Sequence, residues 1–234
     1  MDKLLVILPT YNERENLEAM VAAVRTHLPG AEVLIVDDGS PDGTGDVADG
    51  LAAASPAVHV HHREGKLGLG TAYLFGFRWA LDRGFDYVFQ MDTDFSHDPA
   101  DLPRLLEAAR AGGDVVIGSR YVAGGGTSDW SAFRQAISRG GGTYTRLVLG
   151  IGVRDPTAGF KCFRRSALEA LLAGDLRAEG FSFQIEVNYL AHRLGLRLVE
   201  VPITFHERRA GTSKMSLRIF LEGLLMVWRV RLRR

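Results

Sequence analysis

Three short polar clusters in this 234-residue chain combine carboxylates with hydroxyl or amide side chains, and each directly follows an apolar run. A single cluster has an ordinary explanation, because Asn, Asp and Ser are good helix caps where a strand turns into a helix. If the three clusters meet, however, their carboxylates repel one another unless a cation or hydrogen-bond donors neutralise them. The clusters therefore predict a charged-ligand or metal site; their five acids are Glu13, Asp37, Asp38, Asp92 and Asp94.

The sharpest of these clusters is Asp92-Thr93-Asp94, which follows a continuous apolar run. Two carboxylates separated by one residue can approach the same cation where the backbone leaves extended geometry. Hard oxygen ligands suit Mg²⁺ or Mn²⁺, and a magnesium ion held by one or two carboxylates takes its other ligands from water and substrate phosphates. A lone Asp-x-Asp is a weak signal, but its place at a strand end strengthens the prediction of a divalent metal site.

The elements that must position these clusters alternate between short β-rich runs and helical patterns. Strands separated by helices of this length indicate repeated βαβ units, and hence an α/β fold with a doubly wound, mostly parallel sheet. Ligands of such sheets bind outside the carboxyl ends of the strands, where the polar clusters lie. The expected strands are 4–8, 33–36, 58–60, 87–91 and 115–117, and the expected helices are 13–27, 44–54, 71–82 and 100–111.

The second half of the chain has a different character. The glycine triplets at 124–126 and 140–142 predict an irregular loop region between them. Helices are expected over 166–172 and 183–194, and a strand over 198–205 that Pro202 places at a sheet edge or bends. With no internal repeat or low-complexity linker, we expect a single domain with an elaborated C-terminal half.

Composition excludes several classes of protein. Lys plus Arg and Asp plus Glu both number 28, so no basic excess points to a nucleic-acid partner. The one cysteine, Cys162, forbids an internal disulfide and fits a reducing compartment, and its apolar context favours core packing. His59, His61 and His62 lack the spacing of a helical zinc site and are expected to be structural or exposed. No targeting or membrane-spanning segment is expected.

The C-terminal segment is the one strongly charged part of the chain. From residue 207 onward it has eight basic residues against two acidic ones. Helical spacing puts its apolar residues on one stripe beside this cationic end, as in a helix that lies in a membrane interface. From these residues alone, core packing is at least as good an explanation as lipid contact. The apolar residues are Leu217, Phe220, Leu221, Leu224, Leu225 and Trp228.

Several motifs occur in the order seen in family 2 glycosyltransferases, and within that family the chain resembles the polyprenyl-phosphate (dolichyl-phosphate) mannose synthases. The resemblance runs from about residue 4 to about residue 216. The motifs are Pro9-x-Tyr11-Asn12-Glu13, Val36-Asp37-Asp38-Gly39-Ser40, Lys66-x-Gly68-x-Gly70, Met91-Asp92-x-Asp94, Gly118-Ser119-Arg120-Tyr121, Asp155-Pro156-Thr157-Ala158-Gly159-Phe160 and Arg208-x-x-Gly211-x-Ser213-Lys214.

The resemblance implies a fold of the GT-A type and a role for each matching residue. A glycosyltransferase domain would cover 1–216, and 217–234 would be an amphipathic, basic segment at the membrane surface. The donor nucleotide sugar would contact Pro9, Tyr11, Glu13, Val36, Asp38, Asp92, Thr93, Asp94, Arg120, Arg208 and Lys214, of which Asp92, Asp94, Arg120, Arg208 and Lys214 would also act in catalysis. Arg134 and Arg139 would receive the acceptor phosphate, and Asp94, Asp92 and Ser96 would bind the metal.

The implied reaction is a metal-dependent, inverting transfer of mannose from GDP-mannose to polyprenyl phosphate. Mg²⁺ or Mn²⁺ would be the cofactor, and the enzyme would lie at the cytoplasmic face of the membrane, with an integral membrane partner as a further possibility. The nearest alternative is the same machinery with UDP-glucose as donor. A nucleotide-dependent oxidoreductase is disfavoured because the first strand lacks a glycine fingerprint, and a non-catalytic module is disfavoured by the intact Asp92 and Asp94.

Overall fold

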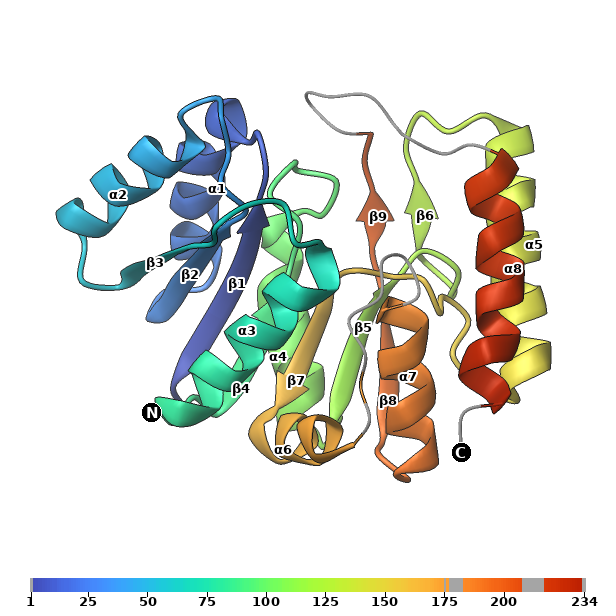
Figure 1. Ribbon diagram of the computed structural model, residues 1–234. Coiled ribbons are helices and arrows are strands. Elements are labelled where there is room, and N and C mark those ends of the chain that lie inside the picture. The colour runs from blue at the N-terminus through green and yellow to red at the C-terminus, as the bar shows by residue number, and fades with distance from the viewer. Residues whose placement is uncertain (1, 175, 177–182, 208–216, 233–234) are drawn as a thin grey trace.

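The structure is a computed structural model that describes residues 2–174, 176, 183–207 and 217–232, with only the backbone given for 217–224. In this part of the chain, seven strands form one sheet in the order β3-β2-β1-β4-β7-β5-β8 (Figure 1). The strands are β1 (Leu4–Thr10), β2 (Ala31–Asp37), β3 (Val58–His62), β4 (Tyr87–Gln90), β5 (Val115–Ser119), β7 (Lys161–Arg164) and β8 (Leu198–Pro202).

The sheet is doubly wound and mostly parallel, as the sequence predicts. Each of the five strands expected in the first half is present, and only β7 runs antiparallel, between β4 and β5. Strand β7 is not predicted from the sequence, because four residues that include a lysine give no strand pattern. Strand β1 lies between β2 and β4 and runs parallel to both. The carboxyl ends of these three strands therefore lie side by side.

Helices cover both faces of the sheet, and alternate residues of β1 face them. Leu5 and Ile7 pack with α3, α6 and α7, whereas Val6 and Leu8 pack with α1, α2 and α4. The alternation produces two apolar cores, one on each side of the sheet. These helices are α1 (Arg14–His27), α2 (Thr44–Ala54), α3 (Leu69–Asp82), α4 (Leu102–Arg110), α6 (Arg165–Ala173) and α7 (Phe183–Arg193), close to the predicted bounds.

One expectation about the second half was wrong. Residues 132–149 form an 18-residue helix, α5 (Ala132–Leu149), which runs straight through the glycine triplet 140–142. Ser131 caps it by accepting a hydrogen bond from the backbone N–H of Arg134 (3.2 Å), and Gly150 ends it in the left-handed conformation (φ 69°). The two caps and tertiary packing outweigh the helix-destabilising effect of the glycines, which amounts to about 1 kcal/mol each.

The C-terminal helix α8 (Leu217–Leu232) lies alongside α5 at one end of the molecule (Figure 1). Val227 and Val230 are buried in the core on one side of α8, while Leu225 and Trp228 on another side are 65% and 49% exposed. Core packing therefore explains one face of α8, whereas membrane contact of the exposed face stays a prediction.

Pro202 has the effect predicted for it. It ends the edge strand β8, after which the chain bends into β9 (Thr204–Phe205), and β9 pairs with β6 (Gly126–Thr127) as a separate two-stranded sheet. A proline at this point lacks the donor that a continuing central strand would need.

The single cysteine and the three histidines of β3 make packing and pairing contacts. Cys162 is fully buried in β7, and burial raises the pKa of its thiol far above the ordinary value. His59 contacts Glu32 (2.6 Å), His62 contacts Asp49 (2.9 Å), and His61 stacks on Phe75. Each of these four residues therefore has a packing or pairing role.

Close packing of α3 on β1 gives a first prediction. A Cβ atom at Gly76 would lie 2.7 Å from Cδ1 and 2.9 Å from Cγ2 of the buried Ile7. Gly76→Ala should therefore lower the free energy of unfolding by about 1–3 kcal/mol through overpacking. Gly50→Ala is the matched control, because Gly50 is a helical glycine with nothing within 4 Å, and it should raise stability by about 0.5–1 kcal/mol. Urea unfolding followed by circular dichroism measures both, and equal effects would contradict the packing explanation.

Candidate active site

Strand register brings the first two polar clusters side by side. Pro9 pairs with Val36 and Thr10 with Asp37 across β1 and β2. The third cluster joins them from β4, since the Thr93 hydroxyl donates to the backbone carbonyl of Pro9 (3.0 Å). The predicted convergence at the carboxyl ends of the strands is therefore confirmed.

Hydrogen-bond donors and an arginine of the protein itself neutralise Asp37 and Asp38, one of the two ways expected from the sequence. Asp37 accepts hydrogen bonds from the hydroxyls of Thr10 (3.0 Å) and Ser40 (2.6 Å), and thereby fixes the turn after β2. Asp38 is buried and forms an ion pair with Arg63, a residue that the sequence analysis did not single out. Arg63 follows β3, and only the tertiary fold brings it to the end of β2.

The remaining residues expected to meet the nucleotide lie at the same edge. Tyr11 is partly exposed, and the Lys66 ammonium sits 4.0 Å from the centre of its ring. Glu13 accepts a hydrogen bond from the Asn16 side chain (2.8 Å), while Val36 is fully buried. Tyr11 thus presents an aromatic face beside a cation, a suitable surface for a base or a phosphate.

The Asp-x-Asp segment turns sharply after β4. Asp94 is buried and accepts a hydrogen bond from the backbone N–H of Ser96 (3.0 Å), and Asp92 accepts one from the hydroxyl of Tyr73 (3.3 Å). The Ser96 hydroxyl is also buried, and it has no hydrogen-bond partner in the described chain.

These oxygens fit a hard divalent cation. Among the described residues, no three His, Cys, Asp or Glu side chains gather as a metal group. The oxygens of Asp92, Asp94 and Ser96 lie in one short segment after β4, and magnesium held by one or two carboxylates takes its other ligands from water and substrate phosphates.

Three buried polar residues, Lys161, Gln184 and Gln90, form a hydrogen-bonded layer near this segment. Lys161 of β7 is fully buried and donates to the side-chain oxygen of Gln184 (2.5 Å), which also accepts from Gln90 of β4 (2.8 Å). Burial lowers the pKa of Lys161 to about 7, although the charges of Asp155 and Asp92 act in the opposite direction. Sequence patterns gave no sign of this layer, because its members come from separate elements.

His97 lies above the same layer, between the rings of Phe160 and Phe205. Burial lowers its pKa to about 4, against the opposing charge of Asp94, so the imidazole is neutral at pH 7. At neutral pH His97 therefore adds no positive charge beside Asp94.

Arg120 is held by Asp155 in a buried, two-pronged ion pair. Its Nε and one terminal nitrogen each donate to a different carboxylate oxygen at 2.7 Å, and Thr157 accepts a further hydrogen bond (2.9 Å). Burial opposes the charge, but hydrogen bonding to Asp155 prevails and raises the pKa of Arg120. Asp155 in turn is positioned by its backbone N–H, which donates to Glu200 of β8 (3.0 Å).

The two arginines expected to receive the acceptor phosphate occupy different surroundings on α5. Arg134 forms an ion pair with Glu207 (2.9 Å) and stacks over Trp130, whereas Arg139 lines a pocket together with Arg120. Arg208 and Lys214 lie outside the described residues.

Open α/β sheets of this kind form a class of proteins that bind their ligands outside the carboxyl ends of the strands, where the polar clusters of this chain lie. Residues 5–172 match the family model described as glycosyl transferase family 2. The chain belongs to this family, and it is a glycosyltransferase.

Two relatives are similar over nearly the whole chain. A polyprenol monophosphomannose synthase of Mycolicibacterium smegmatis is 49% identical over 230 residues, which cover 97% of this chain and 87% of the relative. An undecaprenyl-phosphate mannosyltransferase of Micrococcus luteus is 49% identical over 227 residues, which cover 97% and 93%.

Solved structures share the fold at lower identity. Glucosyl-3-phosphoglycerate synthase from Mycobacterium tuberculosis, solved with phosphoglyceric acid, has a TM-score of 0.68 at 22% identity and covers 99% of this chain and 79% of its own. A mannosyltransferase from Pyrobaculum calidifontis, solved with GDP-Man and Mn²⁺, has a TM-score of 0.68 at 18% identity and covers 99% and 64%. The fold class expected from the sequence is confirmed. No helix in the described ranges is both long and apolar enough to cross a membrane.

The buried ion pair generates a second prediction. Asp155→Asn leaves the Arg120 charge without its counterion, and breaking a buried pair from one side should cost about 3–5 kcal/mol of unfolding free energy. The control is Arg104→Gln, which breaks a solvent-exposed pair with Asp101 and should cost less than about 1 kcal/mol. Chemical unfolding measures the two variants, and similar losses would show that the buried pair has no special weight.

Proposed function

We propose that this enzyme transfers mannose from GDP-mannose to the phosphate of polyprenyl phosphate. The observation that carries the proposal is 49% identity across 97% of the chain to two proteins whose names both combine a polyprenyl-type lipid with mannosyl transfer. The oxygens at the strand ends suit a donor with a diphosphate, and the cationic pocket on α5 suits an acceptor phosphate.

The donor would lie across the carboxyl ends of β1, β2 and β4. In this proposal Pro9, Tyr11, Glu13, Val36 and Asp38 form the nucleoside pocket. Tyr11 is the exposed aromatic surface there, and Asp38 is held in place by Arg63. Because Asp38 is already paired, its part is to shape the pocket rather than to bind a metal. Arg120, Arg208 and Lys214 complete the proposed donor contacts.

A divalent cation, Mg²⁺ or Mn²⁺, would be held by Asp94 and Asp92, with Ser96 as a third oxygen ligand. Its chemistry would be to stabilise negative charge on the departing diphosphate. The orphaned Ser96 hydroxyl and the neutral His97 beside the carboxylates support this assignment. A thiolate or imidazole ligand is not required for such a cation.

The transfer itself needs little from a general base. The acceptor is a phosphate monoester whose second pKa is about 6, so it is largely ionised near neutral pH. Its oxygen would attack C1 of mannose while the bond from C1 to the diphosphate breaks and GDP leaves with the electron pair. Direct displacement inverts the configuration and gives a β-linked product from an α-linked donor.

The test uses purified protein with polyprenyl phosphate, Mg²⁺ or Mn²⁺, and labelled GDP-mannose or UDP-glucose in parallel. We expect label in the organic phase from GDP-mannose alone and a β-linkage by NMR. Label from UDP-glucose alone would replace the donor and keep the mechanism. An α-linked product would contradict direct displacement, and label from neither donor would contradict the proposed function.

The metal assignment gives a third prediction. Asp94→Asn keeps an oxygen that can accept the Ser96 N–H but removes the charge, so it should lower turnover by about 100-fold or more. Asp82→Asn, an exposed acid at the end of α3, is the control and should leave turnover unchanged. Circular dichroism verifies the fold. Equal activity of the two variants would remove Asp94 from the metal site.

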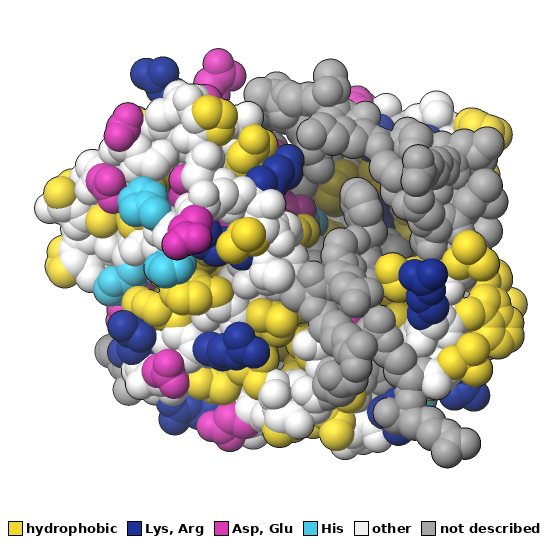
Figure 2. Space-filling model, in the orientation of Figure 1, with side chains coloured by type: hydrophobic (Ala, Val, Ile, Leu, Met, Phe, Trp, Pro, Cys, Tyr) yellow, Lys and Arg dark blue, Asp and Glu magenta, His cyan; other side chains and the backbone are white. Residues whose placement is uncertain are grey.

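The enzyme would reach its lipid acceptor by lying on the membrane surface, and the proposed site of contact comprises α5 and α8. Phe133 and Leu147 of α5 are 76% and 79% exposed, and α8 adds Leu225, Trp228 and Leu232. Figure 2 shows hydrophobic side chains gathered at this end of the molecule, with cationic ones beside them. Apolar side chains flanked by arginines are typical of interfacial helices, and here they extend the proposed contact beyond 217–234.

This surface yields a fourth prediction. The double variant Phe133→Ser, Leu147→Ser should bind vesicles of phosphatidylcholine and phosphatidylglycerol at least about tenfold more weakly, because it removes two exposed apolar anchors. Wild-type binding should also fall as salt is raised. Leu67→Ser, Leu194→Ser removes two exposed leucines elsewhere and serves as the control in the same flotation assay. Unchanged binding by the α5 variant would exclude α5 from the contact.

A further inference from the structure

Trp130 lies in the turn between β6 and α5, and its indole N–H lacks an acceptor. The Nε1 atom is buried and has no hydrogen-bond partner in the described chain. The side chain itself is well held, because Gln135 donates to the backbone carbonyl of Trp130 (3.1 Å) and the indole meets the ring of Phe205 edge-on at 5.5 Å. A buried donor without an acceptor costs free energy, and native folds contain few of them, so this N–H requires an explanation.

The backbone before Trp130 is strained. Ser128 donates its backbone N–H to the carbonyl of Phe205 (2.9 Å), directly after the pairing of β6 with β9. The next residue, Asp129, adopts the left-handed conformation (φ 62°). A residue other than glycine in this conformation costs free energy, and such residues are found at turns and functional sites. The strained turn brings the indole of Trp130 against Phe205.

The Trp130 ring lies close to residues expected to contact both substrates. The guanidinium carbon of Arg120, proposed to contact the donor, is 5.6 Å from the ring centre. That of Arg134, expected from the sequence at the acceptor phosphate, is 4.0 Å away. Phe205 extends the cluster, because it packs edge-on against His97 (5.4 Å), which follows the Asp-x-Asp segment. Trp130 therefore lies where the two proposed substrates would meet.

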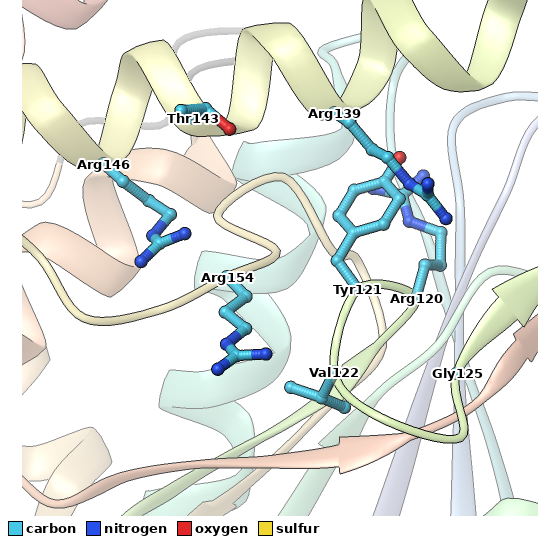
Figure 3. A pocket seen from close by; sticks show the side chains of 8 residues that line it. All are labelled: Arg120, Tyr121, Val122, Gly125, Arg139, Thr143, Arg146 and Arg154. Atoms are coloured by element: carbon cyan, nitrogen blue, oxygen red, sulfur yellow. The ribbon is translucent and has the colours of Figure 1, made fainter.

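The cationic pocket under α5 is a different space. Its volume is about 490 Å³, and Trp130 is not among the described residues that line it. Figure 3 shows the side chains around this pocket, which include Arg120, Tyr121, Arg139, Arg146 and Arg154. The pocket and the indole share Arg120, whose guanidinium carbon is 5.1 Å from the centre of the Tyr121 ring.

A sugar hydroxyl suits the indole N–H at this position. In the direct displacement proposed above, C1 of the sugar lies between the departing diphosphate and the attacking phosphate. The sugar therefore lies between the residues that contact those two phosphates. Arginines are the better partners for phosphate oxygens. An indole N–H is uncharged and donates only, and a hydroxyl oxygen can accept its hydrogen bond.

We propose that Trp130 contacts the sugar of the donor, and that its indole N–H donates a hydrogen bond to a hydroxyl of the transferred hexose. Trp130 then holds the sugar while the strand-end residues hold the nucleotide, a role that rests on the proposed function. A site built to hydrogen-bond a substrate hydroxyl discriminates against a ligand that lacks it. Trp130 therefore contributes to binding of the nucleotide sugar and not to binding of the free nucleotide.

The first experiment uses Trp130→Phe in the full chain, which keeps an aromatic ring and removes the N–H. Calorimetry with Mg²⁺ measures the affinities for GDP-mannose and for GDP. We expect the variant to bind GDP-mannose about five- to tenfold more weakly and GDP as tightly as wild type. Trp79→Phe is the matched control, because Trp79 is a half-buried indole on α3 that stacks on Phe85, and it should leave both affinities unchanged. An equal loss for both ligands, or no loss for either, overturns the inference.

A second experiment detects the contact without altering Trp130. The chain has three tryptophans, so Trp79→Phe, Trp228→Phe leaves Trp130 as the sole one. Its fluorescence should change with GDP-mannose by more than it changes with GDP, because only the first ligand brings a sugar to the indole. Identical spectra with the two ligands contradict the contact.

Failure of the proposed function is distinguishable from failure of this inference. Wild-type enzyme that binds GDP-mannose but transfers nothing to polyprenyl phosphate refutes the function, yet both binding experiments still test Trp130. If UDP-glucose is the donor that binds, its comparison with UDP replaces that with GDP, and the same differences are expected. In active enzyme, a KM that rises only for polyprenyl phosphate in Trp130→Phe would move the contact to the acceptor and overturn the inference.

Discussion

The buried ion pair between Arg120 and Asp155 is the interaction on which the arrangement of both sites depends. It ties the end of β5 to the loop after α5, and Glu200 extends it to the edge strand β8. Asp155 is fully buried and Arg120 is nearly so, and two hydrogen bonds of 2.7 Å join their side chains. Such a pair offsets the cost of burial only when its hydrogen bonds are well formed. On one side of this pair lies the polar layer beneath the Asp-x-Asp segment, and on the other lies the cationic pocket under α5. A change at either residue is therefore felt in both places.

Acidic residues and arginines occupy separate regions near this ion pair. At the strand ends, hydroxyl groups donate to Asp37 and Arg63 pairs with Asp38. Asp92 and Asp94 lie in the next turn, where the histidine beside them is neutral. Across the pair, the described lining of the cavity includes arginines and no acidic side chain. The acidic residues at the strand ends and the arginine-lined cavity are therefore separate surfaces of the molecule.

Part of the fold was predictable because the apolar runs and helical periods of the first half are consistent with each other. The strands at 4–8 and 33–36 and the helix at 44–54 appear close to their expected bounds. The glycine triplet at 140–142 misled the prediction, since helix propensity is a weak local term and the caps and partners of α5 override it. Strand β7 escaped notice because its buried Lys161 is tolerated only through partners that come from distant elements.

The sequence by itself determined the family, the sheet and the identity of the acids at the strand ends, because these follow from local order along the chain: an apolar run, then a polar turn, then a helix. Only the tertiary structure decided which acids are already neutralised, which face of α8 is buried, and that Arg146 and Arg154 share a cavity with Arg139. Those facts depend on contacts between residues far apart in the chain. Whether a side chain is buried or paired depends on its neighbours in space, and the order of residues along the chain does not specify those neighbours.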